Sequence, residues 1–184
     1  MPRNTRNTRN TRNHESPKGL LDKTRFVFSR CRVFRVTALL LFAGACAPAP
    51  QTQNTPKSGE TMPASIIEPY LKIQDGLAHD SVDNVRANAG DIATAATALG
   101  APAMKIDTAA VQLASAGDLA DARQKFGVLS EAIVAYKDGL KLKAGDGVKQ
   151  AFCPMALKPW LQKGDTISNP YYGSEMPTCG SFTQ

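Results

Sequence analysis

Apolar residues recur at alternating intervals of three and four through the middle of the chain, which is the spacing of one buried helix face. The clearest run follows Asp118, a residue type that caps helix N-termini, and its apolar positions are Leu119, Ala122, Phe126, Leu129, Ile133, Tyr136 and Leu140. A second run, which Asp80 or Ser81 is expected to cap, has the apolar positions Val82, Val85, Ala89, Ile92, Ala96 and Leu99. Gly100 followed by Pro102 ends this second helix.

Two shorter helices complete the helical pattern. One is expected from about Ser65, with Pro69 in its first turn, and the other over residues 103–116, with Gly117 closing it. Their inward positions are Tyr70, Ile73 and Leu77 in the first, and Ile106, Ala110 and Leu113 in the second. Because short turns join the four helices as antiparallel neighbours, the sequence predicts an all-α fold, an up-and-down four-helix bundle within residues 65–184.

The pattern changes after Leu142. Residues 145–147 are typical of a turn, residues 148–152 favour a short extended piece, and the remainder of the chain is expected to be poor in regular structure. We expect this irregular segment, rich in aromatic residues and cysteine, to pack on the bundle. Its aromatic patch consists of Trp160, Tyr171 and Tyr172, and we expect the patch to be either core or interface.

The N-terminal part of the chain predicts export. A basic approach at residues 24–35 leads into an apolar run at residues 36–45, which is too short to span a bilayer but fits a signal peptide. Small residues then precede Cys46, as in the bacterial lipobox. We therefore predict a lipoprotein signal peptide with a low-complexity Arg-Asn-Thr extension over residues 1–45, and a lipidated Cys46 with a flexible tether over residues 46–64. The alternative is an ordinary secretory signal cleaved near Ala45.

The predicted processing changes the charge of the protein. The chain carries 22 basic and 16 acidic residues, but 10 of the basic and only two of the acidic residues precede Cys46. The mature part therefore holds 12 basic and 14 acidic residues, a net charge of −2. Such a domain has no electrostatic footprint for nucleic acid. We expect a protein on the periplasmic side of the bacterial envelope, anchored by lipid in the outer membrane.

The predicted processing removes Cys31 and acylates Cys46, which leaves one cysteine pair, Cys153 and Cys179. Two methionines, Met155 and Met176, lie close to this pair in the sequence. Thiolates and thioethers together form a soft ligand set that favours Cu(I) over harder ions. In an oxidising compartment, however, a lone cysteine pair is usually a disulfide. Both interpretations stay open at this point: a Cu(I) site made of the four sulfurs, or a Cys153–Cys179 staple.

The C-terminal motifs resemble a known family. They are Phe152-Cys153-Pro154-Met155, Trp160-Leu161-Gln162, Asn169-Pro170-Tyr171-Tyr172-Gly173-Ser174-Glu175-Met176 and Cys179-Gly180, with a further match at residues 126–132. Over residues 66–182 the chain resembles the domain of unknown function 3347 family. The resemblance implies a bacterial envelope domain that occurs alone or fused to periplasmic adaptor subunits of heavy-metal and copper efflux pumps. In that family no biochemical activity is established.

Catalysis is not expected from these residues. The mature chain has one histidine, His79, and it has no Cys-x-x-Cys pair and no glycine-rich loop opening a helix. We therefore predict a non-catalytic metal-handling accessory linked to heavy-metal efflux or resistance, with an efflux-system or other envelope protein as partner. The alternative is a disulfide-stapled interaction module that docks on an envelope partner without metal.

Overall fold

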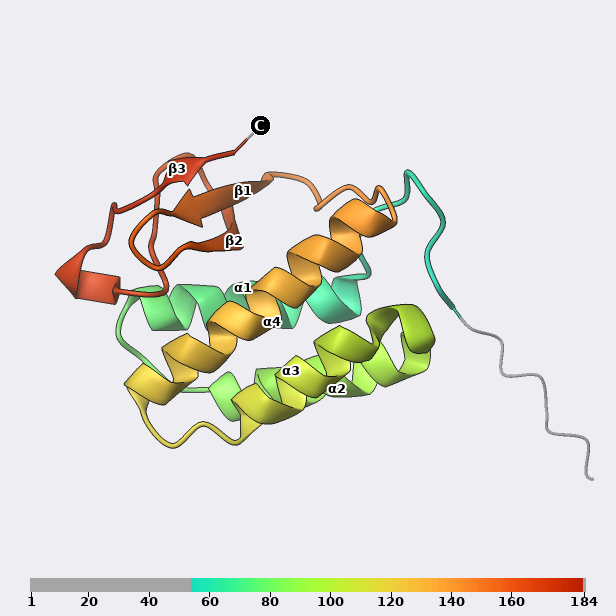
Figure 1. Ribbon diagram of the computed structural model, residues 1–184, viewed down its shortest axis with the longest axis horizontal. Coiled ribbons are helices and arrows are strands. Elements are labelled where there is room, and N and C mark those ends of the chain that lie inside the picture. Colours follow the sequence, from blue (N-terminus) through green and yellow to red (C-terminus); the bar gives the residue numbers. More distant parts are fainter. Residues whose placement is uncertain (1–53, 184) are drawn as a thin grey trace, which may run out of the picture. The chain divides into compact units, whose positions relative to one another are not determined.

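The structure, a computed structural model, describes residues 54–183 (Figure 1). The helices are α1 (Ala64–Ala78), α2 (Val85–Leu99), α3 (Met104–Ala114) and α4 (Leu119–Gly139), with a single 3₁₀ turn at Ala101–Ala103 between α2 and α3. The strands β1 (Val148–Cys153), β2 (Lys158–Lys163) and β3 (Ser181–Phe182) come after α4, with a second 3₁₀ turn at Gly173–Glu175. The predicted signal peptide and Cys46 lie outside the described residues.

The four predicted helices are present, and most of their predicted inward positions are buried. Asp118 caps α4 as expected, since its carboxylate accepts a hydrogen bond of 2.8 Å from the Asp121 N–H. Leu119 and Leu140 are partly exposed, and the other five apolar positions of that helix are buried. The alternating three- and four-residue spacing therefore located the buried face of α4 correctly.

The start of α2 was predicted wrongly. The helix begins at Val85, with Asn84 before it in a left-handed conformation, so Val82 is 45% exposed and neither Asp80 nor Ser81 is the cap. Asp80 instead pairs with Arg123 of α4 and accepts a hydrogen bond from the Ser174 N–H. Pro69 lies inside α1 and not in its first turn, because α1 begins at Ala64.

The prediction of an all-α fold is wrong, because the C-terminal segment forms a three-stranded antiparallel sheet in the order β2-β1-β3. Helices account for 52% and strands for 12% of residues 54–183, so the fold is mixed α/β. The short extended piece expected at residues 148–152 is confirmed as β1. The strand β2 was missed because its hairpin has no Asn-Gly or Asp-Gly turn: Leu157, a non-glycine residue, supplies the positive φ of 54°.

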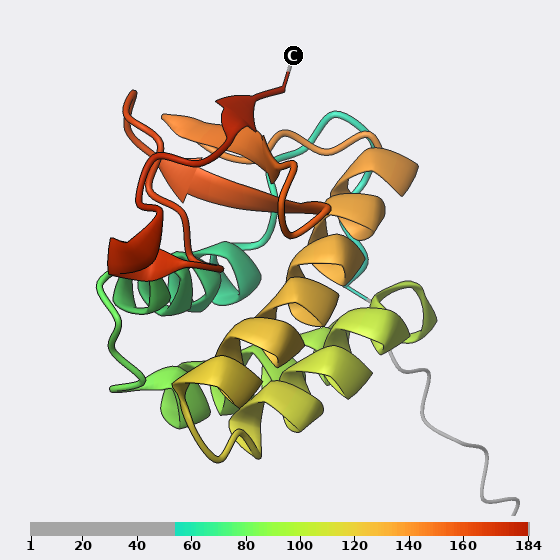
Figure 2. The same ribbon diagram turned by 60° about the vertical axis from the view of Figure 1, so that its left-hand side comes forward.

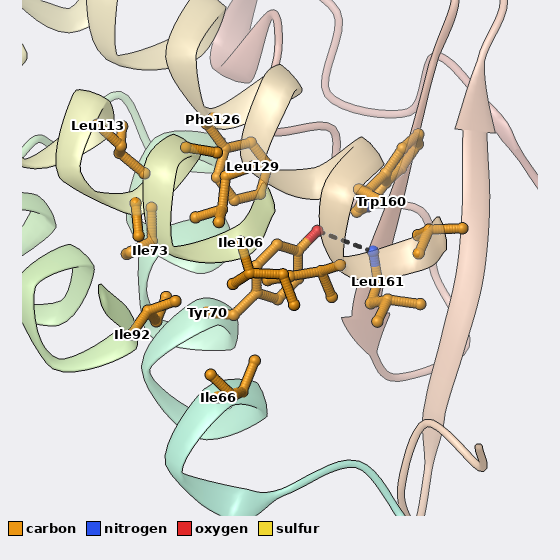
Figure 3. Packing of buried hydrophobic residues seen from close by; sticks show 14 of the residues in the cluster. Ile66, Tyr70, Ile73, Ile92, Ile106, Leu113, Phe126, Leu129, Trp160 and Leu161 are labelled. Atoms are coloured by element: carbon orange, nitrogen blue, oxygen red, sulfur yellow. Dashed lines mark hydrogen bonds between the residues drawn. The ribbon is translucent and has the colours of Figure 1, made fainter. Parts of the chain in front are cut away.

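The sheet covers the side of the helices formed by α1 and α4, while α2 and α3 lie on the opposite side (Figures 1 and 2). β2 packs against both α1 and α4, so the core is continuous from the helices into the sheet. Large side chains from every layer are fully buried, as Figure 3 shows for Tyr70, Ile92, Phe126, Trp160 and Leu161.

A chain of buried hydroxyls joins the helices to β2. The Leu161 N–H donates to the Tyr70 hydroxyl over 3.1 Å (Figure 3), and the hydroxyls of Tyr70 and Ser130 are 2.5 Å apart. Ser130 in turn donates to the Pro159 carbonyl over 2.8 Å, and that carbonyl also accepts the Tyr171 hydroxyl. Burial raises the pKa of Tyr70 far above its ordinary value, so the phenol stays protonated.

Part of the segment expected to be a tether packs on this domain. Met62 is 2% exposed, its N–H donates to the Lys143 carbonyl, and the Lys143 N–H donates back to the Glu60 carbonyl. Further upstream, the Thr55 hydroxyl donates to the Leu99 carbonyl. Between residues 54 and 183, no helix combines the length and the apolar character that a membrane crossing requires.

Two tyrosines on α1 and α4 provide a matched test of the hydroxyl chain. Tyr70→Phe leaves the buried Leu161 N–H without its partner, so we expect a loss of about 1–3 kcal/mol in the free energy of unfolding. The Tyr136 hydroxyl is buried without a hydrogen-bond partner among the described residues, so Tyr136→Phe should be neutral or stabilising. Urea unfolding monitored by circular dichroism measures both, and equal losses in the two variants would contradict this assignment.

Replacing Gly180 and Gly90 by alanine should change the stability of the fold in opposite directions. Gly180 has a φ of +140°, and an added Cβ would lie 2.6 Å from the Trp160 ring and 2.9 Å from the Phe152 carbonyl oxygen. We expect Gly180→Ala to cost about 1–3 kcal/mol. Gly90 lies inside α2 with nothing within 4 Å of an added Cβ, so Gly90→Ala should stabilise by about 0.5–1 kcal/mol. Thermal unfolding midpoints report both signs, and a stabilising Gly180→Ala would refute the close approach.

Candidate functional site

The candidate site is built on the pairing of β1 with β3. Cys153 is the last residue of β1, and Cys179 lies two residues before β3. Phe152 pairs with Ser181 across the two strands, which brings the cysteines together from 26 positions apart in the chain. Their sulfurs lie 3.8 Å apart, and both residues are free thiols. Cys153 is completely buried, whereas Cys179 is only partly buried.

The buried sulfur is surrounded by N–H donors. The backbone N–H of Ala156 lies 3.4 Å from the Cys153 Sγ, and the side-chain amide Nδ2 of Asn169 lies 3.3 Å from it. The Cys153 sulfur therefore accepts two N–H hydrogen bonds from within the protein. Since the Cys153 side chain has no exposed surface, these donors take the place that water would occupy.

The Cys179 sulfur lies in a different environment from the Cys153 sulfur. Loss of solvent, the hydrogen bond with Cys153 and the charge of that residue raise the pKa of the Cys179 thiol above its ordinary value, and the backbone of Met155 partly offsets the rise. The two thiols are therefore not equivalent. Cys153 is the fixed, buried partner, and Cys179 is the partner that solvent reaches.

The two methionines predicted as ligands stand at the border of the site. Met155 follows Cys153 in the β1–β2 turn and is 61% exposed, and Met176 is partly exposed after the second 3₁₀ turn. Neither belongs to the buried core. The structure thus brings the cysteines into contact and leaves the thioethers at the surface. Within residues 54–183, no group of three or more His, Cys, Asp or Glu side chains is arranged to hold a metal ion.

The predicted aromatic patch divides into core and surface. Trp160 is fully buried, donates its indole N–H to the Gln162 side chain over 2.9 Å, and meets Tyr171 edge to face with ring centroids 5.9 Å apart. Tyr171 is also buried and contacts the Phe126 ring. Tyr172 is partly exposed and lines a groove of about 350 Å³. Trp160 and Tyr171 therefore attach the sheet to α4, and only Tyr172 faces solvent.

Two residues that the sequence patterns did not single out hold the site together. Asn169 is fully buried and contacts both cysteines through its side-chain amide. Arg123 of α4 donates to the carbonyls of Leu77 and Pro170 and pairs with Asp80, so it fastens the segment after Asn169 to the helices. The Asn-Pro dipeptide was the available signal, because Asn before Pro favours a turn with a side chain bound to the backbone.

A glycine completes this attachment. Gly173 has a φ of +52°, and an added Cβ would collide with the Arg123 guanidinium and the Asp80 carboxylate. Asn169, Pro170, Tyr171 and Gly173 thus each make contacts that fix the segment leading to Cys179.

Comparison with known proteins adds no further information. No family model matches the chain. No curated protein and no solved structure matches it significantly. The resemblance noted from the sequence motifs therefore remains a prediction.

Proposed function

We propose that this protein is a non-catalytic, lipid-anchored accessory of the bacterial envelope that binds a soft metal ion such as Cu(I). Cys153 and Cys179 would supply two thiolates, and Met155 and Met176 would supply thioethers from the adjacent surface. The observation that carries the proposal is the 3.8 Å separation of two unbonded cysteine sulfurs, one of them buried among N–H donors.

The 3.8 Å separation of the Cys153 and Cys179 sulfurs suits one metal ion bound by both. Two thiolates bound through metal–sulfur bonds of about 2.3 Å, at tetrahedral to trigonal angles, lie about 3.8–4.0 Å apart. The ion would therefore need little movement of either sulfur. A disulfide would need more, because its sulfurs are bonded at about 2.05 Å.

The donor set decides which ion fits. Soft thiolate and thioether ligands select Cu(I), whereas carboxylate and carbonyl oxygens suit harder ions such as Mg²⁺ and Ca²⁺. Within residues 54–183, no carboxylate or imidazole joins the cysteine pair in a group of three or more ligands. Two thiolates alone leave coordination positions open, and the surface thioethers of Met155 and Met176 are the nearest soft donors in sequence to fill them.

The unequal burial of the cysteines suits an ion that is taken up and passed on. The ion would reach the site past Cys179 and Met155, which solvent contacts, and would rest against Cys153, which it does not. Such a site fits a buffer or a donor to an efflux system. The resemblance to a family found fused to adaptor subunits of copper efflux pumps supports that partner.

The alternative is a disulfide-stapled interaction module without metal. The same proximity of Cys153 and Cys179 would allow it, and an oxidising compartment favours it. The two functions differ in the state of the thiols, because metal binding requires both to be reduced.

We expect the protein, purified from its host in mild detergent and reduced, to take one Cu(I) from a chromogenic chelator under anaerobic conditions. The Cys153→Ser, Cys179→Ser double variant should lose this binding. Met155→Leu should weaken it, because a thioether donor is lost. Met104→Leu is the matched control, since Met104 is 62% exposed on α3 and Met155 is 61% exposed.

Two results would overturn the proposal. One is unchanged Cu(I) affinity in the double cysteine variant. The other is a count of no free thiols in protein taken directly from its native envelope under non-reducing conditions, which would favour the staple.

The proposed anchor has a separate test. Mass spectrometry of the protein from the envelope should find an N-terminus at Cys46 that carries acyl chains, because lipidation at this residue is what would hold the domain at the membrane. An N-terminus elsewhere, or an unmodified Cys46, would contradict lipid anchoring and leave the cysteine site to be tested on its own.

A further inference from the structure

Asn169 joins the two halves of the candidate site. It is fully buried, and its side-chain Nδ2 donates to the Cys153 Sγ over 3.3 Å and to the Cys179 carbonyl over 2.6 Å. Its Oδ1 accepts from the backbone N–H groups of Tyr171 and Tyr172, at 2.8 Å and 3.3 Å. All the hydrogen-bonding groups of one side chain are thus used within the site.

The orientation of this amide is fixed by its surroundings. Turning it over would set the NH₂ group against two backbone N–H donors, and would set the carbonyl oxygen against a sulfur and another carbonyl. Only the orientation that points the amide N–H groups at Cys153 and at Cys179 satisfies every group. The backbone of Asn169 is held as well, since its N–H donates to the Pro177 carbonyl and its carbonyl accepts the Gly173 N–H.

The two N–H donors of this amide hold the two cysteine segments in place. The N–H at Cys153 hydrogen-bonds a sulfur that has no exposed surface. The N–H at the Cys179 carbonyl fixes the backbone that carries the second sulfur. No aliphatic or acidic side chain of the same size supplies both donors together with the acceptor.

We propose that Asn169 is the positioning residue of the metal site, which holds the Cys153 sulfur in place and sets Cys179 at the distance that one ion requires. The inference rests on the proposed function, because it assigns Asn169 a role toward the ion that the two cysteines would bind. Groups that hydrogen-bond to metal ligands in this way change metal affinity about 10–100-fold when they are removed.

The test uses two substitutions that keep part of the hydrogen bonding. Asn169→Asp retains an oxygen for the Tyr171 and Tyr172 N–H groups but has no donor for Cys153. Asn169→Ser is uncharged and can still accept from the Tyr171 N–H as a serine turn. Both should weaken Cu(I) binding about 10–100-fold in the chelator competition, with the protein as its host processes it.

Two matched controls separate positioning from stability. Asn88 on α2 is also buried, and its side chain donates to the Asn84 carbonyl, so Asn88→Asp removes a comparable donor away from the cysteines. Tyr70→Phe lowers stability through the hydroxyl chain. We expect both controls to bind Cu(I) within about twofold of the unsubstituted protein. The position of the ultraviolet thiolate-to-copper band should change only in the Asn169 variants, because only they alter the donors at sulfur.

Each outcome decides one of the two proposals. An unsubstituted protein that does not bind Cu(I) overturns the proposed function and this inference with it. Binding that is equally tight in the unsubstituted protein and in folded Asn169 variants overturns the inference alone. Affinity losses that follow stability across all variants, or loss of the fold in both Asn169 variants, would make Asn169 a structural residue and overturn the inference as well.

Discussion

The fold depends on the hydrogen bonds that side chains of α1 and α4 make to the backbone of the edge strand β2. β2 is an edge strand, and such a strand leaves backbone groups that must find partners when they are buried. The hydroxyls of Tyr70 and Ser130 provide those partners, one from α1 and one from α4, and they reach Leu161 and Pro159 of β2. Pro159 fits this edge position because it lacks the N–H that a central strand would need. The sheet is therefore bound to the helices by directional bonds as well as by apolar packing.

The candidate site follows from this attachment. With β2 fixed, β1 lies in the middle of the sheet and presents Cys153 at its buried end. The chain after β2 then returns, in contact with both α1 and α4, to form β3 on the other side of β1. It does so through the motif that begins at Asn169, which Arg123 and Tyr171 fasten to the helices and to β2. This return path places Cys179 next to Cys153.

The helical half of the fold could be predicted, because buried residues recur with the period of the helix. Asp118 also marked the start of α4, and Gly100 marked the end of α2. The sheet could not be predicted as completely. β2 contains Pro159, its turn uses Leu157 where glycine or asparagine is usual, and its buried residues run consecutively from Trp160 to Gln162. Buried and exposed residues do not alternate along β2, because packing against α1 and α4 determines which of its side chains are buried.

The cysteine pair could be named from the sequence, because the predicted processing would remove Cys31 and acylate Cys46, and the structure places the sulfurs of the other two cysteines in contact. Asn169 was missed because its role exists only where three distant segments meet. The proximity of the two methionines in sequence likewise said nothing of their exposure: Met155 lies in the turn after Cys153, and Met176 follows the second 3₁₀ turn. Spacing along the chain predicted which atoms are chemically suited to an ion, and the tertiary structure determines which of them are positioned for it.

The most direct test of the central claim is the copper X-ray absorption spectrum of the Cu(I)-loaded protein. If Cys153 and Cys179 share one soft ion, the first coordination shell contains sulfur alone, with at least two sulfur atoms at a single short distance. A shell dominated by nitrogen or oxygen, or one that is unchanged when both cysteines are replaced by serine, would contradict the account.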